Sequence, residues 1–141
     1  MHYLANTNSE LHFLVTSDVE STRRLVVQLL KELGHMKVSE ASNGEMALRS
    51  FKATRAVGAP INFLITDCAM PLMDGLALMR EVRADERLRT VPMLMVTADA
   101  TREHILAATN AGADDYLVKP FNAPKLMQKI ALLTTKYAIA A

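Results

Sequence analysis

The sequence predicts a single α/β domain: a doubly wound, five-stranded parallel sheet with helices on both faces. Five short apolar runs alternate with five longer segments of helix-forming residues. Two of these runs, 61–66 and 91–97, are almost continuously apolar, as strands covered on both faces must be. Such an alternation favours parallel strands joined by right-handed crossovers.

The elements follow one another without an internal repeat. The expected strands are 11–15, 36–41, 61–66, 91–97 and 115–119. The expected helices are 20–34, 44–56, 75–86, 101–113 and 123–138. In the first helix, Leu25, Leu29 and Leu33 recur at the four-residue spacing of one helix face. Gly34 and Gly112 are placed to end helices, and prolines 60, 92 and 124 lie at element boundaries.

Composition restricts the class of protein. The chain has 141 residues, of which 50% are hydrophobic, enough for one domain with a proper core. A net charge of +1 without a basic cluster argues against a nucleic-acid partner. The single cysteine, Cys68, excludes an internal disulfide. No run is long enough to span a membrane and no signal peptide is visible, so we expect a cytoplasmic location.

The expected domain covers residues 11–134. Residues 1–10 and 135–141 are expected to be terminal extensions with poor order. No linker to a second domain is visible, although the chain could be a fragment of a larger protein.

Polar side chains follow the predicted strands where the strands end. The first strand leads to Ser17 and Asp18, the third to Asp67, the fourth to Thr97 and the fifth to Lys119. In a parallel α/β sheet, ligands bind beyond these carboxyl ends. The sequence therefore predicts one site that contains two carboxylates, hydroxyl groups and an ammonium group.

These groups suit phosphoryl transfer to a carboxylate. Asp67 could act as the nucleophile. Asp18 and Asp67 suit Mg2+, a hard cation that binds few carboxylates and keeps several waters. Lys119 could pair with a phosphate oxygen, and Thr97 could donate a hydrogen bond to another.

Four stretches resemble the receiver domain of two-component response regulators. They are "SDVESTRRLV", "TDCAMPLMDG", "VTADA" and "YLVKPF", whose order and spacing match over residues 11–134. Within the family the chain is most similar to the single-domain chemotaxis regulators. The resemblance implies a flavodoxin-like sheet with strand order 2-1-3-4-5.

The resemblance also implies roles for individual residues. Asp67 matches the phosphoacceptor, and Asp18 a direct Mg2+ ligand. The backbone carbonyl of Ala69 matches the third protein ligand. Thr97 and Tyr116 match the switch pair, in which the hydroxyl turns toward the phosphate and the ring turns inward.

Further expectations concern Lys119 and the partners. Lys119 matches the lysine that contacts the phosphate, followed by a cis bond to Pro120. The phosphoryl donor would be the phosphohistidine of a sensor histidine kinase. The face formed by the fourth helix, fifth strand and fifth helix would bind a downstream protein, for example the flagellar motor switch. We expect a monomer that is not a conventional enzyme but catalyses its own phosphoryl transfer and dephosphorylation.

Ser17 departs from the family pattern, which has an acid there that holds a Mg2+-bound water. Ser17-x-x-Glu20 has the spacing of a capping box, so Ser17 could cap the first helix. Alternatively, its hydroxyl could bind the metal-bound water. A unit charge missing about 5 Å from a divalent ion removes roughly 2 to 7 kcal/mol of gross attraction, for effective dielectrics of about 80 to 20. We expect Mg2+ binding to be weakened but not abolished.

Two other functions compete with a phosphorylation-dependent switch. One is a receiver-like interaction module that works without phosphorylation and has a weakened Mg2+ site. The other is a phosphatase with an aspartyl-phosphate intermediate. The phosphatase is disfavoured because such enzymes typically place an acid two residues after the nucleophile, where this chain has Ala69.

Overall fold

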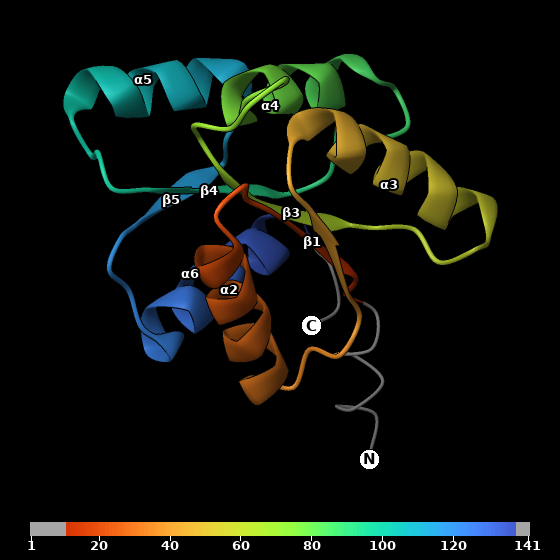
Figure 1. The fold of residues 1–141 in the computed structure, drawn as a ribbon, viewed down its shortest axis with the longest axis horizontal. Helices are drawn as coiled ribbons and strands as arrows, with labels where there is room; N and C mark the ends of the chain where they lie inside the picture. The colour runs from red at the N-terminus through yellow and green to blue at the C-terminus, as the bar shows by residue number, and fades with distance from the viewer. Residues whose placement is uncertain (1–10, 138–141) are drawn as a thin grey trace.

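A computed structural model describes residues 11–137 of the chain. Five parallel strands form one sheet in the order β2-β1-β3-β4-β5 (Figure 1). The strands are β1 (Phe13–Thr16), β2 (Val38–Ala41), β3 (Phe63–Asp67), β4 (Met93–Thr97) and β5 (Asp115–Val118). The predicted fold class and strand order are confirmed.

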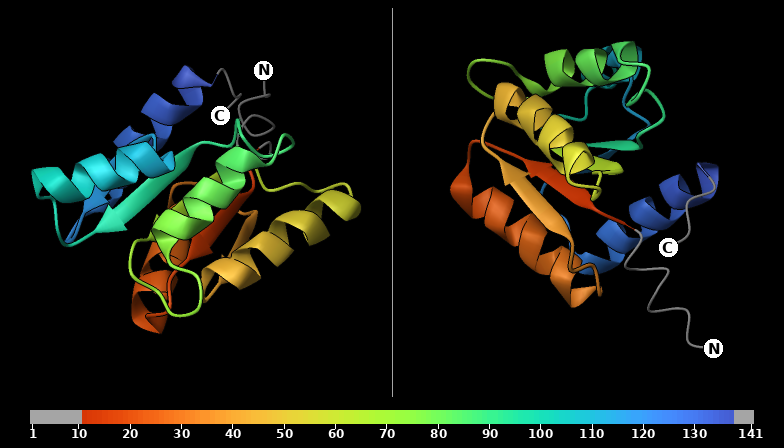
Figure 2. Two further views of the ribbon diagram at one scale, coloured as in Figure 1. Left: turned by 90° about the horizontal axis from the view of Figure 1, so that it is seen from above. Right: turned by 90° about the vertical axis from the view of Figure 1, so that its right-hand side faces the viewer.

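Five helices cover the two faces of this sheet. They are α2 (Glu20–Glu32), α3 (Gly44–Ala56), α4 (Gly75–Ala84), α5 (Arg102–Ala111) and α6 (Ala123–Lys136). Helices α3, α4 and α5 lie on one face and α2 and α6 on the other (Figures 1 and 2). None of these helices is long and apolar enough to span a bilayer. Of the expected extensions, 1–10 and 138–141 lie outside the described residues, while Thr135 and Lys136 belong to α6.

Each face of the sheet has its own apolar core, because neighbouring strand residues point to opposite faces. Leu14 and Leu64 pack with Phe51 and Leu78 under the three helices. Phe13 and Phe63 pack with residues of α2 and α6 on the other face. Their rings are 4.8 Å apart between centroids. Strands β3 and β4 are buried along their whole length, as their composition predicts.

Side-chain caps fix where most helices begin. Asn43, Asp74, Thr101 and Asn122 each accept a hydrogen bond from the backbone N–H three residues ahead. Helix α5 ends at Gly112, whose φ of 113° is in the left-handed region that favours glycine. Helix α4 ends two residues before the expected boundary, because Asp85 is extended and its carboxylate binds the Arg87 N–H instead.

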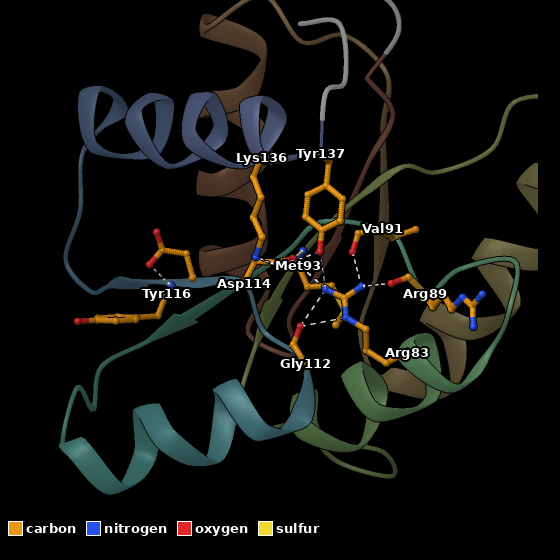
Figure 3. A network of polar contacts seen from close by, with 10 residues as sticks. Arg83, Arg89, Val91, Met93, Gly112, Asp114, Tyr116, Lys136 and Tyr137 are labelled. Atoms are coloured by element: carbon orange, nitrogen blue, oxygen red, sulfur yellow. Dashed lines mark hydrogen bonds and ion pairs between the residues drawn. The ribbon is translucent and has the colours of Figure 1, made fainter.

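A buried polar network joins the amino-terminal ends of β4 and β5 to helices α4 and α6 (Figure 3). The guanidinium of Arg83 donates to the carbonyls of Arg89 and Val91 at 2.8 and 2.7 Å. It also donates to the carbonyl of Gly112 at 2.9 Å. Its Nη2 is 2.9 Å from the Asp114 carboxylate. One planar cation therefore satisfies three loop carbonyls and one acid.

Asp114 is the acceptor at the centre of this network and is 5% exposed. It accepts hydrogen bonds from the Met93 N–H at 2.8 Å, the Tyr137 hydroxyl at 2.7 Å and Lys136 Nζ at 2.8 Å. Burial by itself raises the pKa of the Asp114 carboxyl, but these bonds and the charge of Arg83 hold it below its ordinary value. Burial, together with the bond to Asp114 and its charge, raises the pKa of Tyr137 to about 12. The network fixes the end of α6 to the sheet.

We expect Tyr137→Phe to lower the free energy of unfolding by about 1.5 to 3 kcal/mol, because it removes a hydrogen bond to a buried charged group. Urea denaturation measures the loss. The matched control is Tyr116→Phe, because the Tyr116 hydroxyl has no hydrogen-bond partner among residues 11–137. The free energy of unfolding of this variant should stay within about 0.5 kcal/mol of the wild type. Equal losses in both variants would show that the Tyr137 contact contributes nothing specific.

Candidate functional site

The sequence-predicted residues gather around one cleft at the carboxyl ends of the strands. The cleft has a volume of about 360 Å³. The predicted residues that line it come from four strand ends and are Asp18, Asp67, Ala69, Thr97 and Lys119. Tyr116 does not line it but faces a neighbouring groove between β5 and α6. The parallel register of β1, β3 and β4 brings these groups together.

Asp67 ends the central strand β3, and its side chain is only 8% exposed. Its Oδ1 lies 3.2 Å from Lys119 Nζ, and its Oδ2 lies 2.5 Å from Ser17 Oγ. One carboxylate oxygen therefore has an ion-pair partner and the other a hydrogen-bond donor. A buried carboxylate requires such partners, because desolvation without them is costly.

Ser17 is buried beneath the cleft and does not cap the first helix. Helix α2 begins at Glu20 with Val19 at the N-cap, where no side chain makes a capping bond. The capping-box interpretation is therefore wrong. The Ser17 hydroxyl instead accepts a hydrogen bond from the Val19 N–H at 3.1 Å and donates to Asp67. The serine therefore belongs to the surroundings of Asp67 and not to the helix.

The donor set fits a hard divalent cation. Asp18 is exposed and lines the same cleft as the Asp67 carboxylate, and the cleft also includes Ala69. Two carboxylates and a backbone carbonyl are oxygen ligands of the kind that Mg2+ accepts while keeping several waters. Within residues 11–137, no group of three or more acidic, histidine or cysteine side chains could hold a metal.

The Thr97 hydroxyl is turned toward its own loop. It accepts a hydrogen bond from the Asp99 N–H at 3.0 Å and donates to the Asp99 carbonyl at 3.2 Å. The Tyr116 ring is half-buried, and Lys129 Nζ lies 5.3 Å from its centroid. In Figure 3 the ring points away from the buried network around Asp114. The two side chains lie on neighbouring strands, and the described hydrogen bonds of the Thr97 hydroxyl go to Asp99 and not to Asp67.

Lys119 directly follows β5, and the backbone there fixes its position. Its backbone N–H donates to the Thr97 carbonyl at 2.8 Å, which ties β5 to β4 at the site. The expected cis peptide bond between Lys119 and Pro120 is present.

Other residues also line the cleft, among them His104 and Cys68. His104 lies in the first turn of α5, the helix that Thr101 caps. Burial raises the pKa of the Cys68 thiol, and the charges of Asp74, Asp67 and Asp99 raise it further. A thiol in such surroundings stays protonated and unreactive.

Gly75 also shapes the site, although the sequence indicates it only as the start of a helix. Asp74 does cap α4, since its carboxylate accepts from the Ala77 N–H at 2.8 Å. The Gly75 N–H also donates to the Cys68 carbonyl at 2.7 Å. A Cβ on Gly75 would lie 2.1 Å from the Asp67 carbonyl oxygen, which no real contact permits. Glycine here allows α4 to touch the end of the strand that carries Asp67.

Comparisons with known proteins agree with this architecture. A model described as the response regulator receiver domain matches residues 13–131. The chemotaxis protein CheY of Pseudomonas aeruginosa is 42% identical over 120 residues, which are 85% of this chain and 93% of the relative.

Two solved structures are also similar. The chemotaxis protein CheY4 of Vibrio cholerae has a TM-score of 0.77 at 29% identity, covering 87% of this chain and 98% of the other. The receiver domain of a sensor histidine kinase of Pseudomonas aeruginosa was solved with a magnesium ion coordinated in its active site cleft. It has a TM-score of 0.76 at 29% identity, covering 91% and 98% of the two chains.

We expect Gly75→Ala to shift the backbone at Asp67 and Cys68 and to destabilise the protein by about 1 to 3 kcal/mol through overpacking. Changes in the amide resonances of Asp67 and Cys68 in a two-dimensional NMR spectrum check the displacement. The control is Gly58→Ala, because a Cβ there meets nothing within 4 Å and its φ of 77° strains only a distant loop. Unshifted resonances at Asp67 in folded Gly75→Ala would contradict the close contact.

Proposed function

Because the chain belongs to the family of response regulator receiver domains, we propose that it is a phosphorylation-dependent signalling switch whose phosphoacceptor is Asp67. The observation that carries this proposal is the setting of the Asp67 carboxylate. It is nearly buried at the end of β3, borders an open cleft and has an ammonium group 3.2 Å away. This arrangement supports a nucleophile whose negative charge is balanced in place.

The donor in this proposal is a phosphohistidine of a sensor histidine kinase. A bond forms between an Asp67 carboxylate oxygen and phosphorus as the bond between phosphorus and the imidazole nitrogen breaks. The imidazole leaves with the electron pair. Lys119 is near enough to pair with an oxygen of the transferred group. Hydrolysis of the resulting acyl phosphate returns inorganic phosphate and free Asp67.

Asp18, Asp67 and the Ala69 carbonyl would hold Mg2+ in this site. When bound, the ion would neutralise charge that develops on the transferring phosphoryl group. The magnesium in the cleft of the Pseudomonas aeruginosa receiver domain supports the assignment by similarity. The chain's own contribution is to present oxygen ligands from β1 and β3 at one edge of the sheet.

The output would follow from Thr97 and Tyr116. The Thr97 hydroxyl would leave the Asp99 backbone and bind the phosphoryl group, and the Tyr116 ring would move inward. This rearrangement would remodel the face made by α5, β5 and α6. A groove there is lined by Tyr116, Val118 and the ammonium groups of Lys125 and Lys129. Its chemistry suits a partner segment that is both apolar and acidic.

Similarity to chemotaxis proteins makes the flagellar motor switch our candidate for that partner. The cytoplasmic location and the monomeric state expected from the sequence are parts of the same proposal.

We expect Asp67→Asn to abolish labelling by a small acyl phosphate in the presence of Mg2+, because the amide lacks the nucleophilic carboxylate. Intact-protein mass spectrometry measures the gain of one phosphoryl group. Asp74→Asn is the matched control, since asparagine can also cap α4 and Asp74 does not line the cleft. A labelled Asp67→Asn protein would exclude Asp67 as the acceptor.

The hydroxyl at position 17 favours a second candidate, an interaction module that works without phosphorylation. The two candidates differ in how a partner responds to phosphodonor. For the switch, we expect donor and Mg2+ to change partner affinity by about 5- to 150-fold, the usual range of coupling between two sites. A pull-down with the motor-switch protein checks this, and Asp67→Asn should remove the response. Binding that is equal with and without donor would support the module.

A further inference from the structure

The hydroxyl of Ser17 makes the shortest described contact with the Asp67 carboxylate. Ser17 is 2% exposed and Asp67 is 6% exposed, so water does not compete strongly for this bond. At 2.5 Å, the bond has the length of a charge-assisted O–H···O⁻ interaction. The Val19 N–H donates to the same hydroxyl at 3.1 Å, and the Val19 carbonyl at 3.4 Å is a much longer alternative acceptor for the hydroxyl hydrogen than Asp67.

The two oxygens of Asp67 are not equivalent toward a cation. Oδ1 faces the ammonium group of Lys119 at 3.2 Å, and this positive charge repels a second cation on the same side. Oδ2 is therefore the oxygen available to Mg2+, and it is the oxygen that the Ser17 hydroxyl occupies. The hydroxyl hydrogen and a cation bound at Oδ2 would both place positive charge on the same oxygen.

We propose that Ser17 is a positioning residue that holds the Asp67 carboxylate and competes with Mg2+ for its Oδ2 oxygen. The proposal rests on the proposed function, because it takes Asp67 as both phosphoacceptor and metal ligand. A carboxylate oxygen has two lone pairs, but a divalent ion at Oδ2 repels the hydroxyl hydrogen bound to the same oxygen, so the ion and the short Ser17 bond disfavour each other. Binding of the ion must turn the hydroxyl away or lengthen its bond.

Competition and a purely passive role predict opposite changes in Mg2+ affinity when the Ser17 hydroxyl is removed. If Ser17 were only a missing acid that bound a metal-bound water, removal of its hydroxyl would weaken Mg2+ binding. If Ser17 competes with the ion, removal of the hydroxyl tightens Mg2+ binding, because the metal-free protein loses a bond that is absent or weaker in the bound form.

The test compares Mg2+ affinity, measured by calorimetry, in the wild type, Ser17→Ala and Ser17→Thr. We expect Ser17→Ala to bind Mg2+ about tenfold more tightly, the factor that corresponds to one hydrogen bond to a charged group. Ser17→Thr keeps the hydroxyl and should bind as the wild type does. The melting temperature of Ser17→Ala should fall in a chelator and recover more than that of the wild type when Mg2+ is added.

Two more variants make the result unambiguous. Ser17→Asp adds a charge and should tighten binding by either route, which shows that the assay detects this site. Asp67→Asn should remove binding; if it does not, the metal site of the proposed function is wrong, whatever Ser17 does. Ser17→Cys replaces Ser17→Ala if the latter does not fold, because a thiol is a weak donor. Unchanged or weaker affinity in Ser17→Ala, or in Ser17→Cys as its substitute, would overturn the competition.

Discussion

The buried carboxylate of Asp67 is the constraint on which the rest of the site depends. The residue closes a strand that is buried along its length, so its charge must be compensated by neighbouring strand ends. Lys119 supplies an ammonium group from β5 and Ser17 a hydroxyl from the end of β1. Both can reach the carboxylate because β1, β3, β4 and β5 are parallel and in register. The sheet topology therefore determines the electrostatics of the site.

At the amino-terminal ends of β4 and β5, a second acid also needs its charge compensated. The Asp114 side chain is 5% exposed, compared with 8% for Asp67, and Arg83, Lys136 and Tyr137 compensate its charge. The Met93 N–H also donates to it. The two acids differ in their surroundings: Asp114 joins the sheet to α4 and α6, whereas Asp67 borders the cleft.

Sequence periodicity predicted the fold class and the strand-end residues of the cleft, because such residues in a parallel sheet lie at one edge. The strand order and the place of Ala69 were predicted from the resemblance to receiver domains. The missing parts depend on contacts between distant residues. Tyr137 is bonded to Asp114, 23 residues earlier, and no local pattern connects them. Gly75 had a local explanation as a helix start, which concealed its contact with Asp67. Ser17 had the spacing of a capping box, but its hydroxyl has a stronger acceptor in the buried Asp67 carboxylate.

In the proposed function, the serine also changes how the acceptor depends on the cation. An acid in its place would put a second carboxylate beside Asp67, and two such charges repel each other unless a cation lies between them. Ser17 avoids this repulsion and supplies a hydrogen-bond donor, so Lys119 and Ser17 each contact one oxygen of the Asp67 carboxylate. Mg2+ would then serve phosphoryl transfer and would not be needed to hold the carboxylate in place. This separation follows from a single hydroxyl, and it links the departure from the family pattern to the mechanism of the site.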